Sequence, residues 1–237
     1  MRKILRALGI ILFSVMGLVS LHSIRVTESL KLSVQNEKAT ADRYKEKADS
    51  LEANLKIVEE AKDSLEKELE STKKNMEYLT ALSPLKGLVS EDEINELIKE
   101  IPHGNPFRCD FIVTSKFGER TLDHGVNIRT HTGVDIIPVS DEWIITPIDS
   151  GAVESYGYDA VYGKYVYVRH SDRVRTFSAH GETIYNRGTT GHIVDDNTAI
   201  MYMGDTGYSK GKHLHFEIQV WTGERWQAVN PLPFLEG

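Results

Sequence analysis

The feature that most constrains this chain is a long stretch, residues 27–82, that contains neither proline nor glycine. The stretch is rich in Glu, Lys, Ala and Leu, which are good helix formers. A heptad repeat fits it, and twelve of its fifteen core positions are apolar. The a positions are Val34, Ala41, Ala48, Leu55, Lys62, Leu69 and Met76, and the d positions are Leu30, Glu37, Tyr44, Leu51, Val58, Leu65, Thr72 and Leu79. Such a sustained apolar seam predicts a coiled coil.

A single helix that exposed this seam to water would be unstable, because most helices depend on the packing of their apolar face. We therefore expect a homodimer through the coiled coil, with packing onto another protein as the alternative. Glu37 and Lys62 interrupt the seam. They either fix the register and the number of helices or simply weaken the coil.

The N-terminus has the pattern of a secretory signal. A basic flank, residues 2–6, precedes an apolar run, residues 7–21. The run is short for a membrane-spanning helix, although Ile24 and Val26 extend it. Because no small-x-small cleavage site follows, the sequence favours an uncleaved signal anchor over a removed signal peptide. The basic end should stay in the cytoplasm, and the rest of the chain should cross the membrane.

Helix breakers and a change of pattern then divide the chain. Pro84 and Gly87 end the long helix, and Ser90 with Glu93 forms a capping box that predicts a short helix before Pro102. Short alternating segments separated by Gly, Asp, Asn and Ser follow, which predicts a mainly β domain with an antiparallel sheet. The expected organisation is a signal anchor or signal peptide in 1–26, a coiled coil in 27–83, a linker with a short helix in 84–104, and the β domain in 105–237.

Charge and cysteine content exclude two classes of protein. The formal net charge is −7 and the pI is about 5.7, with no long basic run, so we expect no nucleic-acid partner. A single cysteine, Cys109, makes an intramolecular disulfide impossible, and we expect it to pack as a small apolar residue.

Three segments of the β domain place polar, metal-binding side chains on strand faces. In "HLHFEIQV", His213, His215, Glu217 and Gln219 share one face, and the apolar residues share the other. If "HTGVDII" is one strand, His131 and Asp135 point the same way. "RVRTFSAH" puts His180 on the side of Thr176 and Ser178, opposite Phe177 and Ala179.

Imidazole and carboxylate are ordinary ligands of zinc, and a hydrolytic zinc site needs three of them plus one open position. The candidates exceed that number by two, which leaves two imidazoles to move protons or stabilise charge. These candidates are His131, Asp135, His180, His213 and His215. We expect structural roles for the other histidines, His22, His103, His124, His170 and His192.

The combination of motifs resembles the LytM/lysostaphin-type metallopeptidases of family M23, which cleave peptide cross-links in bacterial cell walls. The matching segments are "SKFGER", "HTGVDI", "YGKYVYVRH" and "MGDTGYSKGKHLHFEI", and they cover most of residues 105–237. The resemblance implies a LytM/lysostaphin-like fold that binds one Zn²⁺ ion. It also implies that the metal ligands are His131, Asp135 and His215 and that the catalytic residues are His180 and His213.

The resemblance further implies a zinc metalloendopeptidase that hydrolyses peptidoglycan stem or cross-bridge peptides. Its location would be the bacterial cell envelope, anchored in the cytoplasmic membrane with the catalytic domain outside, or secreted if the signal is cleaved. The alternative is a non-catalytic regulator or scaffold, an amidase activator or assembly factor, that uses the same domain for binding. The coil or the linker could also cover the substrate groove and keep the enzyme latent.

Overall fold

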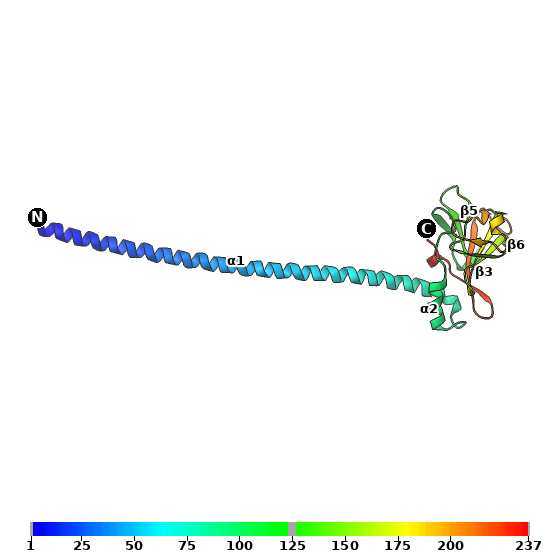
Figure 1. Ribbon diagram of the computed structural model, residues 1–237, viewed down its shortest axis with the longest axis horizontal. Coiled ribbons are helices and arrows are strands. Elements are labelled where there is room, and N and C mark those ends of the chain that lie inside the picture. Colours follow the sequence, from blue (N-terminus) through cyan, green and yellow to red (C-terminus); the bar gives the residue numbers. More distant parts are fainter. Residues whose placement is uncertain (1, 123–126, 237) are drawn as a thin grey trace. The chain divides into compact units, whose positions relative to one another are not determined.

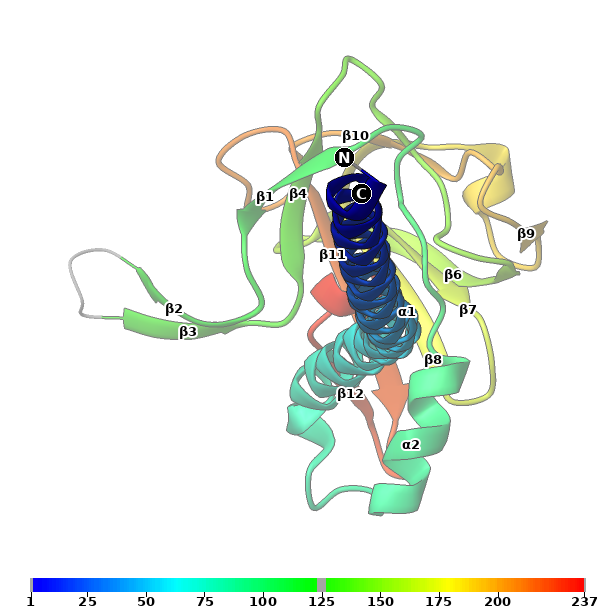
Figure 2. The ribbon, with the colours of Figure 1, turned by 90° about the vertical axis from the view of Figure 1, so that its left-hand side faces the viewer.

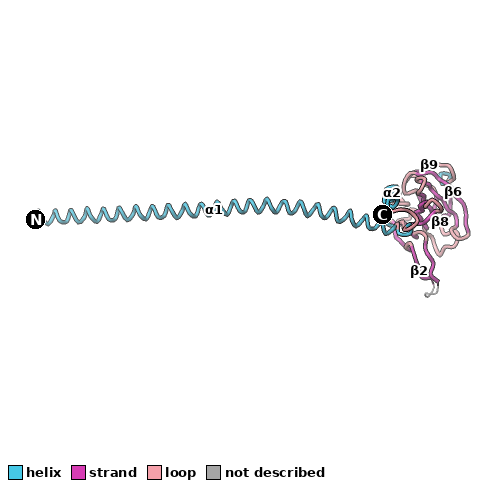
Figure 3. The backbone as a smooth tube through the Cα atoms, turned by 90° about the horizontal axis from the view of Figure 1, so that it is seen from below, coloured by secondary structure: helices cyan, strands magenta, loops and turns pink. Residues whose placement is uncertain are grey.

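The computed structural model describes residues 2–122 and 127–236. The chain divides into two compact units, Met1–Leu69 and Glu70–Gly237, which are described separately. Figure 1 labels the helices and several of the strands, and Figure 3 separates helices from strands by colour.

The first unit is part of one uninterrupted helix, α1 (Arg2–Ala81). The side chains described in this unit, residues 8–69, are all exposed, including seam residues such as Leu55. The long helix is therefore confirmed, whereas its pairing into a coiled coil stays a prediction. Near its N-terminus α1 contains an 18-residue window of mean hydropathy 1.7, apolar and long enough to cross a membrane. A signal sequence passes the same test, so both alternatives for the N-terminus stand.

Two short helices follow in the second unit, η1 (Ser83–Leu85) and α2 (Glu91–Glu100). The predicted capping box is present at the start of α2. The Glu93 backbone N–H donates to Ser90 Oγ at 3.3 Å, and Glu93 Oε2 accepts from the Ser90 backbone N–H at 2.9 Å. These bonds satisfy two helix N–H groups that would otherwise lack a partner.

The segment expected to be a linker contributes to the hydrophobic core of the second unit. Leu85, Leu97 and Ile101 are buried in the same cluster as the apolar strand residues. Tyr78, at the end of α1, stacks on Phe234 with the ring centroids 5.0 Å apart. The last turns of α1 and both short helices are therefore packed against the β domain.

Among the described residues, ten strands form one antiparallel sheet and two more form a separate hairpin. The main path of the sheet is β1-β4-β11-β8-β7-β6-β9, with β10 pairing with β5 and β8, and β12 pairing with β11. In Figure 2 the β2–β3 hairpin extends away from the main sheet. The strands are β1 (Phe111–Ser115), β2 (Gly118–Leu122), β3 (Asn127–His131), β4 (Val134–Pro138), β5 (Ile144–Ile145), β6 (Gly151–Asp159), β7 (Gly163–Arg169), β8 (Val174–Ile184), β9 (Ile193–Val194), β10 (Met201–Met203), β11 (Leu214–Trp221) and β12 (Trp226–Val229).

The core lies on the apolar face of β4 and β11. Val134 pairs with Phe216, and Ile136 pairs with Leu214, and all four side chains are buried. Cys109 packs against this core in a partly buried position, in keeping with its expected apolar role. The structure thus confirms the predicted fold class, an antiparallel β domain preceded by a long helix.

The burial of α2 can be tested by core truncation. Leu97 is 1% exposed, so Leu97→Ala should leave a cavity and lower the free energy of unfolding of residues 70–237 by about 2–5 kcal/mol in urea titrations. The control Ile193→Ala removes an exposed side chain and should change it by less than about 0.5 kcal/mol. Equal effects of the two substitutions would contradict the packing of α2.

Candidate metal centre and active site

Three side chains of types that can hold a metal ion meet where the β2–β3 hairpin joins the main sheet. They are His131 at the end of β3, Asp135 on β4 and His215 on β11. His131 Nε2, His215 Nδ1 and Asp135 Oδ1 lie pairwise 3.0 Å apart. Both imidazoles are buried. The register explains the meeting, because His215 stands directly opposite Asp135 in the β11–β4 pair.

The outward-facing nitrogen of each of these two histidines is held by an acceptor. His131 Nδ1 is 2.8 Å from the carbonyl oxygen of Lys116, and His215 Nε2 is 3.0 Å from Glu217 Oε1. A carbonyl and an ionised carboxylate only accept hydrogen bonds, so these nitrogens carry the protons. His131 Nε2 and His215 Nδ1 are then left with lone pairs aimed at Asp135.

This donor set fits a divalent cation. Asp135 Oδ1 is a carboxylate oxygen, an ordinary ligand of divalent cations, and it faces the two unprotonated imidazole nitrogens. The centre therefore offers one carboxylate oxygen and two imidazole lone pairs. Three lone pairs at this separation repel one another unless a cation lies between them, and zinc takes this combination of ligands.

His131 and Asp135 do not lie on one strand, so that expectation was wrong. β3 ends at His131 and β4 begins at Val134, with a turn at Thr132–Gly133 between them. Any Cβ on Gly133 would lie 2.4 Å from the Phe216 carbonyl oxygen and 2.9 Å from His215 Cε1. Only glycine lets the turn approach β11 this closely. The turn, and not strand alternation, brings His131 and Asp135 together.

The expected face for His180 was also wrong. Across the β8–β11 pair, Phe177 faces Glu217, and Ser178 faces Phe216. Phe177 therefore shares the His215 face, while Ser178 is on the core face. By simple alternation the side chain of His180 would point into the core.

A β-bulge reverses this direction. Lys164 pairs with Gly181 and Val166 with Ser178, so Ala179 and His180 together stand opposite one residue of β7. His180 has φ +62°, the left-handed region that few non-glycine residues adopt. Its ring consequently lies on the metal-centre side, with centroids 4.6 Å from His213 and 6.0 Å from His215.

His180 and His213 are held in the same way. His180 Nδ1 is 2.8 Å from the Thr206 carbonyl oxygen, and His213 Nδ1 is 2.8 Å from the Gly211 carbonyl oxygen. Each Nδ1 therefore carries the proton, and each Nε2 is left as the basic nitrogen. His213 Nε2 lies 3.6 Å from Asp135 Oδ1. Burial lowers the pKa of His180, so this imidazole is neutral at neutral pH.

Aromatic side chains cover the face around these residues. The rings of Tyr162 and Phe177 lie 5.5 and 6.2 Å from His215 between centroids. Tyr165 and Tyr167 pack on Phe177. The face of β11 that carries His215 and Glu217 is therefore buried, and burial strengthens the electrostatic interactions on it.

Sequence reasoning placed Glu217 and Thr206 in the right segments but assigned them no role. The Glu217 carboxylate accepts from His215. Thr206, besides fixing His180, donates from Oγ1 to the Gly181 carbonyl at 2.7 Å and accepts from the Lys164 N–H at 3.0 Å. The sequence feature that could have indicated a role for Glu217 is its position two residues after His215, on the same face of the strand. The contact of Thr206 with His180 could not have been predicted from the sequence, because it uses the backbone carbonyl group that every residue has.

The other histidines have structural surroundings. His103 Nε2 bonds to the Tyr78 hydroxyl, and His170 bonds to the Ser150 carbonyl and Thr176 Oγ1. His192 bonds to Thr189 within its own loop, and His22 is exposed on α1. His124 lies outside the described residues.

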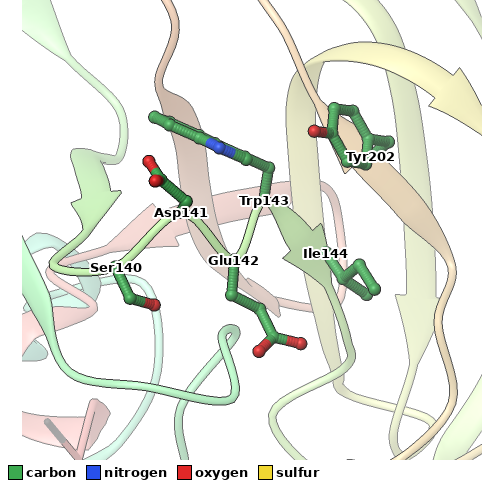
Figure 4. Close-up of a pocket in the computed structure, with 6 residues that line it drawn as sticks. All are labelled: Ser140, Asp141, Glu142, Trp143, Ile144 and Tyr202. Atoms are coloured by element: carbon green, nitrogen blue, oxygen red, sulfur yellow. The ribbon is translucent and has the colours of Figure 1, made fainter.

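A hollow of about 430 Å³ lies beside the loop that leads to His213. Figure 4 shows its lining residues, Ser140, Asp141, Glu142, Trp143, Ile144 and Tyr202. The Trp143 carbonyl accepts from the Met203 N–H at 2.8 Å, and Lys212 Nζ lies 5.9 Å from a Trp143 ring centroid. None of the five predicted site residues lines the hollow.

The strain at His180 is testable with two substitutions that both remove the imidazole. Because φ is positive, His180→Gly should be more stable than His180→Ala by about 1–2 kcal/mol in urea unfolding. At Ser178, where φ is not positive, the order should reverse, with Gly less stable than Ala by about 0.5–1 kcal/mol. The same order at both positions would argue against the bulge.

Comparison with known proteins finds a family that matches part of this chain. Residues 129–231 match the family described as "Peptidase family M23". An uncharacterised metalloprotease of Haemophilus influenzae is 36% identical over 107 residues, which are 44% of this chain and 21% of the relative. The peptidoglycan DD-endopeptidase ShyC of Vibrio cholerae is 37% identical over 114 residues, 46% of this chain and 24% of the relative. The chain thus spans about a quarter of the length of these relatives.

A solved structure, the SpoIIQ–SpoIIIAH pore-forming complex, contains a chain that is similar with a TM-score of 0.47 and 25% identity, covering 58% of this chain and 92% of that one. The matched residues 129–231 contain all five predicted site residues. Residues 129–231 of this chain therefore match peptidase family M23.

Proposed function

We propose that this protein is a zinc-dependent endopeptidase that hydrolyses peptide cross-links of bacterial peptidoglycan. His131, Asp135 and His215 are the proposed metal ligands, and His180 and His213 the proposed catalytic residues. The observation that carries the proposal is the convergence of three lone-pair donors within 3.0 Å of one another, with two further imidazoles beside them.

Zinc at such a centre supplies Lewis acidity toward a carbonyl group and toward water. The two remaining histidines supply the proton transfers. Because carbonyl oxygens hold both Nδ1–H groups, Nε2 of His180 or His213 is free to accept a proton from the attacking water. The partner ring, or the same ring once protonated, donates a hydrogen bond to the oxyanion and a proton to the leaving amine.

The names of the relatives support the substrate class. ShyC is a peptidoglycan DD-endopeptidase, and Mpg of Neisseria meningitidis, 31% identical over 120 residues, is a DD-carboxypeptidase/endopeptidase. These names favour a DD-peptide bond of the cross-link as the bond that is cut. The apolar window of α1 supports a membrane anchor, with the peptidase domain on the outer side, in the periplasm or at the wall.

The proposed dimer is supported by which side chains are buried and which are exposed at the end of α1. Tyr78 and Ala81, at heptad positions c and f, are buried against the core of their own unit. Met76 and Leu79, at positions a and d, stay 64% and 49% exposed. The domain thus occupies one side of the helix and leaves the seam open for a second copy.

Charge complementarity favours a parallel arrangement of the two copies. In a parallel pair each g residue meets the e residue five positions later on the partner. Lys47 then meets Glu52, and Glu68 meets Lys73. The other g residues of the seam carry no charge; they are Ser33, Thr40, Asn54, Ala61 and Asn75.

Digestion of defined cross-linked muropeptides tests the enzymatic proposal. The purified protein should hold one zinc ion and release cross-linked peptides, and a chelator should abolish release until zinc is restored. His215→Ala should lose both metal and activity. His213→Ala should keep the metal and lose about 10²–10⁴-fold in rate. His192→Ala should keep both.

Zinc content is measured by elemental mass spectrometry of the purified protein. The digestion products are identified by their masses. A wild-type protein that holds zinc and leaves every cross-link intact would contradict the enzymatic role and favour a non-catalytic regulator or scaffold.

The dimer is tested by two substitutions on α1 that differ mainly in heptad position. Leu55→Glu introduces a charge at position a, and Ile57→Glu introduces the same charge at position c; both side chains are exposed in the single chain. Sedimentation of residues 27–237 should give a monomer for Leu55→Glu and a dimer for the parent and for Ile57→Glu. Identical masses for all three proteins would refute pairing through this seam.

A further inference from the structure

We propose that Glu217 is a positioning residue of the metal centre, which fixes the proton of His215 on Nε2 and so presents Nδ1 to the metal. This inference rests on the proposed zinc site and adds a role that the ligand set does not contain. The inference predicts that zinc affinity depends on the Glu217 carboxylate, although this carboxylate is not one of the proposed ligands.

The first support is the hydrogen bonding of Glu217. Its side chain is 3% exposed. Oε1 accepts from His215 Nε2 at 3.0 Å and from Thr132 Oγ1 at 2.5 Å, while Oε2 accepts from Gln219 Nε2 at 2.5 Å. All three neighbours donate, so the arrangement suits an ionised carboxylate.

The second support is the tautomer of His215. A neutral imidazole can carry its proton on either nitrogen, and a proton on Nδ1 would block the nitrogen that lies 3.0 Å from Asp135 Oδ1. A carboxylate opposite Nε2 stabilises the other tautomer and keeps the Nδ1 lone pair available. The same bond fixes the plane of the ring.

The third support is the link between the two ligand segments. Thr132 directly follows His131 in the turn before β4, whereas Glu217 lies on β11 two residues after His215. The hydrogen bond between Thr132 and Glu217 therefore ties the turn to the strand and holds the two imidazoles in register.

The fourth support is charge. A buried carboxylate without a compensating positive charge is costly. The hydrogen bonds continue from Gln219 to Arg175, whose Nε donates to Gln219 Oε1 at 2.9 Å. Arg175 also pairs with Glu154 at 2.8 Å, so its positive charge is shared with another carboxylate. A divalent ion at the centre would balance Asp135 and Glu217 together, so the site is neutral when it is loaded.

The test is a zinc affinity measurement by chelator competition on the full chain purified in detergent. Glu217→Gln keeps the shape and removes the charge, and it should weaken zinc binding by about 10- to 100-fold. Thr132→Val removes one donor to Glu217 without touching His215 and should weaken it by a smaller factor. Glu154→Gln, at the far end of the same chain of hydrogen bonds, is the matched control and should bind zinc like the parent.

Thermal unfolding of the metal-free proteins provides the second readout. A positioning role predicts weaker zinc binding by Glu217→Gln even though the metal-free variant remains folded. Binding within twofold of the parent would overturn the inference and leave the proposed function intact. Weakened binding in Glu217→Gln, combined with a parent protein that cuts no cross-link, would support the inference and reject the proposed enzymatic role. A parent that binds no zinc would overturn both.

Discussion

The register of β11 between β4 and β8 is the constraint on which the rest of the site depends. It sets His215 opposite Asp135 on one side and opposite Ala179 on the other. The same register pairs Leu214 with Ile136 and Phe216 with Val134 in the buried core. A slip by one residue would put the apolar side chains where the ligands are. Burial of the core therefore enforces the approach of His215 to Asp135, and the proposed metal site depends on the same hydrogen-bond ladder as the fold.

The candidate metal ligands and the neighbouring histidines are held in place by different kinds of structure. His131, Asp135 and His215 lie on strands, whereas His180 and His213 are both fixed by carbonyl groups of one loop, those of Thr206 and Gly211. The loop is itself held by tight packing, since a Cβ on Gly207 would lie 2.3 Å from the Gly163 backbone nitrogen. Rigid strands suit the proposed role of holding an ion, and a loop with its own anchors suits the proposed role of the two rings in proton transfer.

Local patterns predicted much of this structure, and non-local pairing explains what they missed. The capping box at Ser90, the long helix and the alternation of His215 and Glu217 are set by neighbours in sequence, so they could be read from the chain. The turn at Gly133 and the bulge at His180 depend on β11 and β7, which are distant in sequence. The ring of His180 lies beside His213, but strand alternation would have pointed its side chain into the core. The proposal of His180 as a site residue came from the resemblance of the motifs to a known family and not from alternation.

The packing of residues 84–104 bears on whether this segment could cover the active site. α2 contacts β8 at its beginning, where Arg173 pairs with Glu100 at 3.2 Å and with Glu93 at 3.6 Å. His180 lies seven residues further along, about 23 Å for an extended strand. Leu97 and Ile101 are buried in the core, so moving α2 to the other end of β8 would expose them to water. These contacts favour a structural role for the segment, as an extension of the core, over a role as a cover of the metal centre.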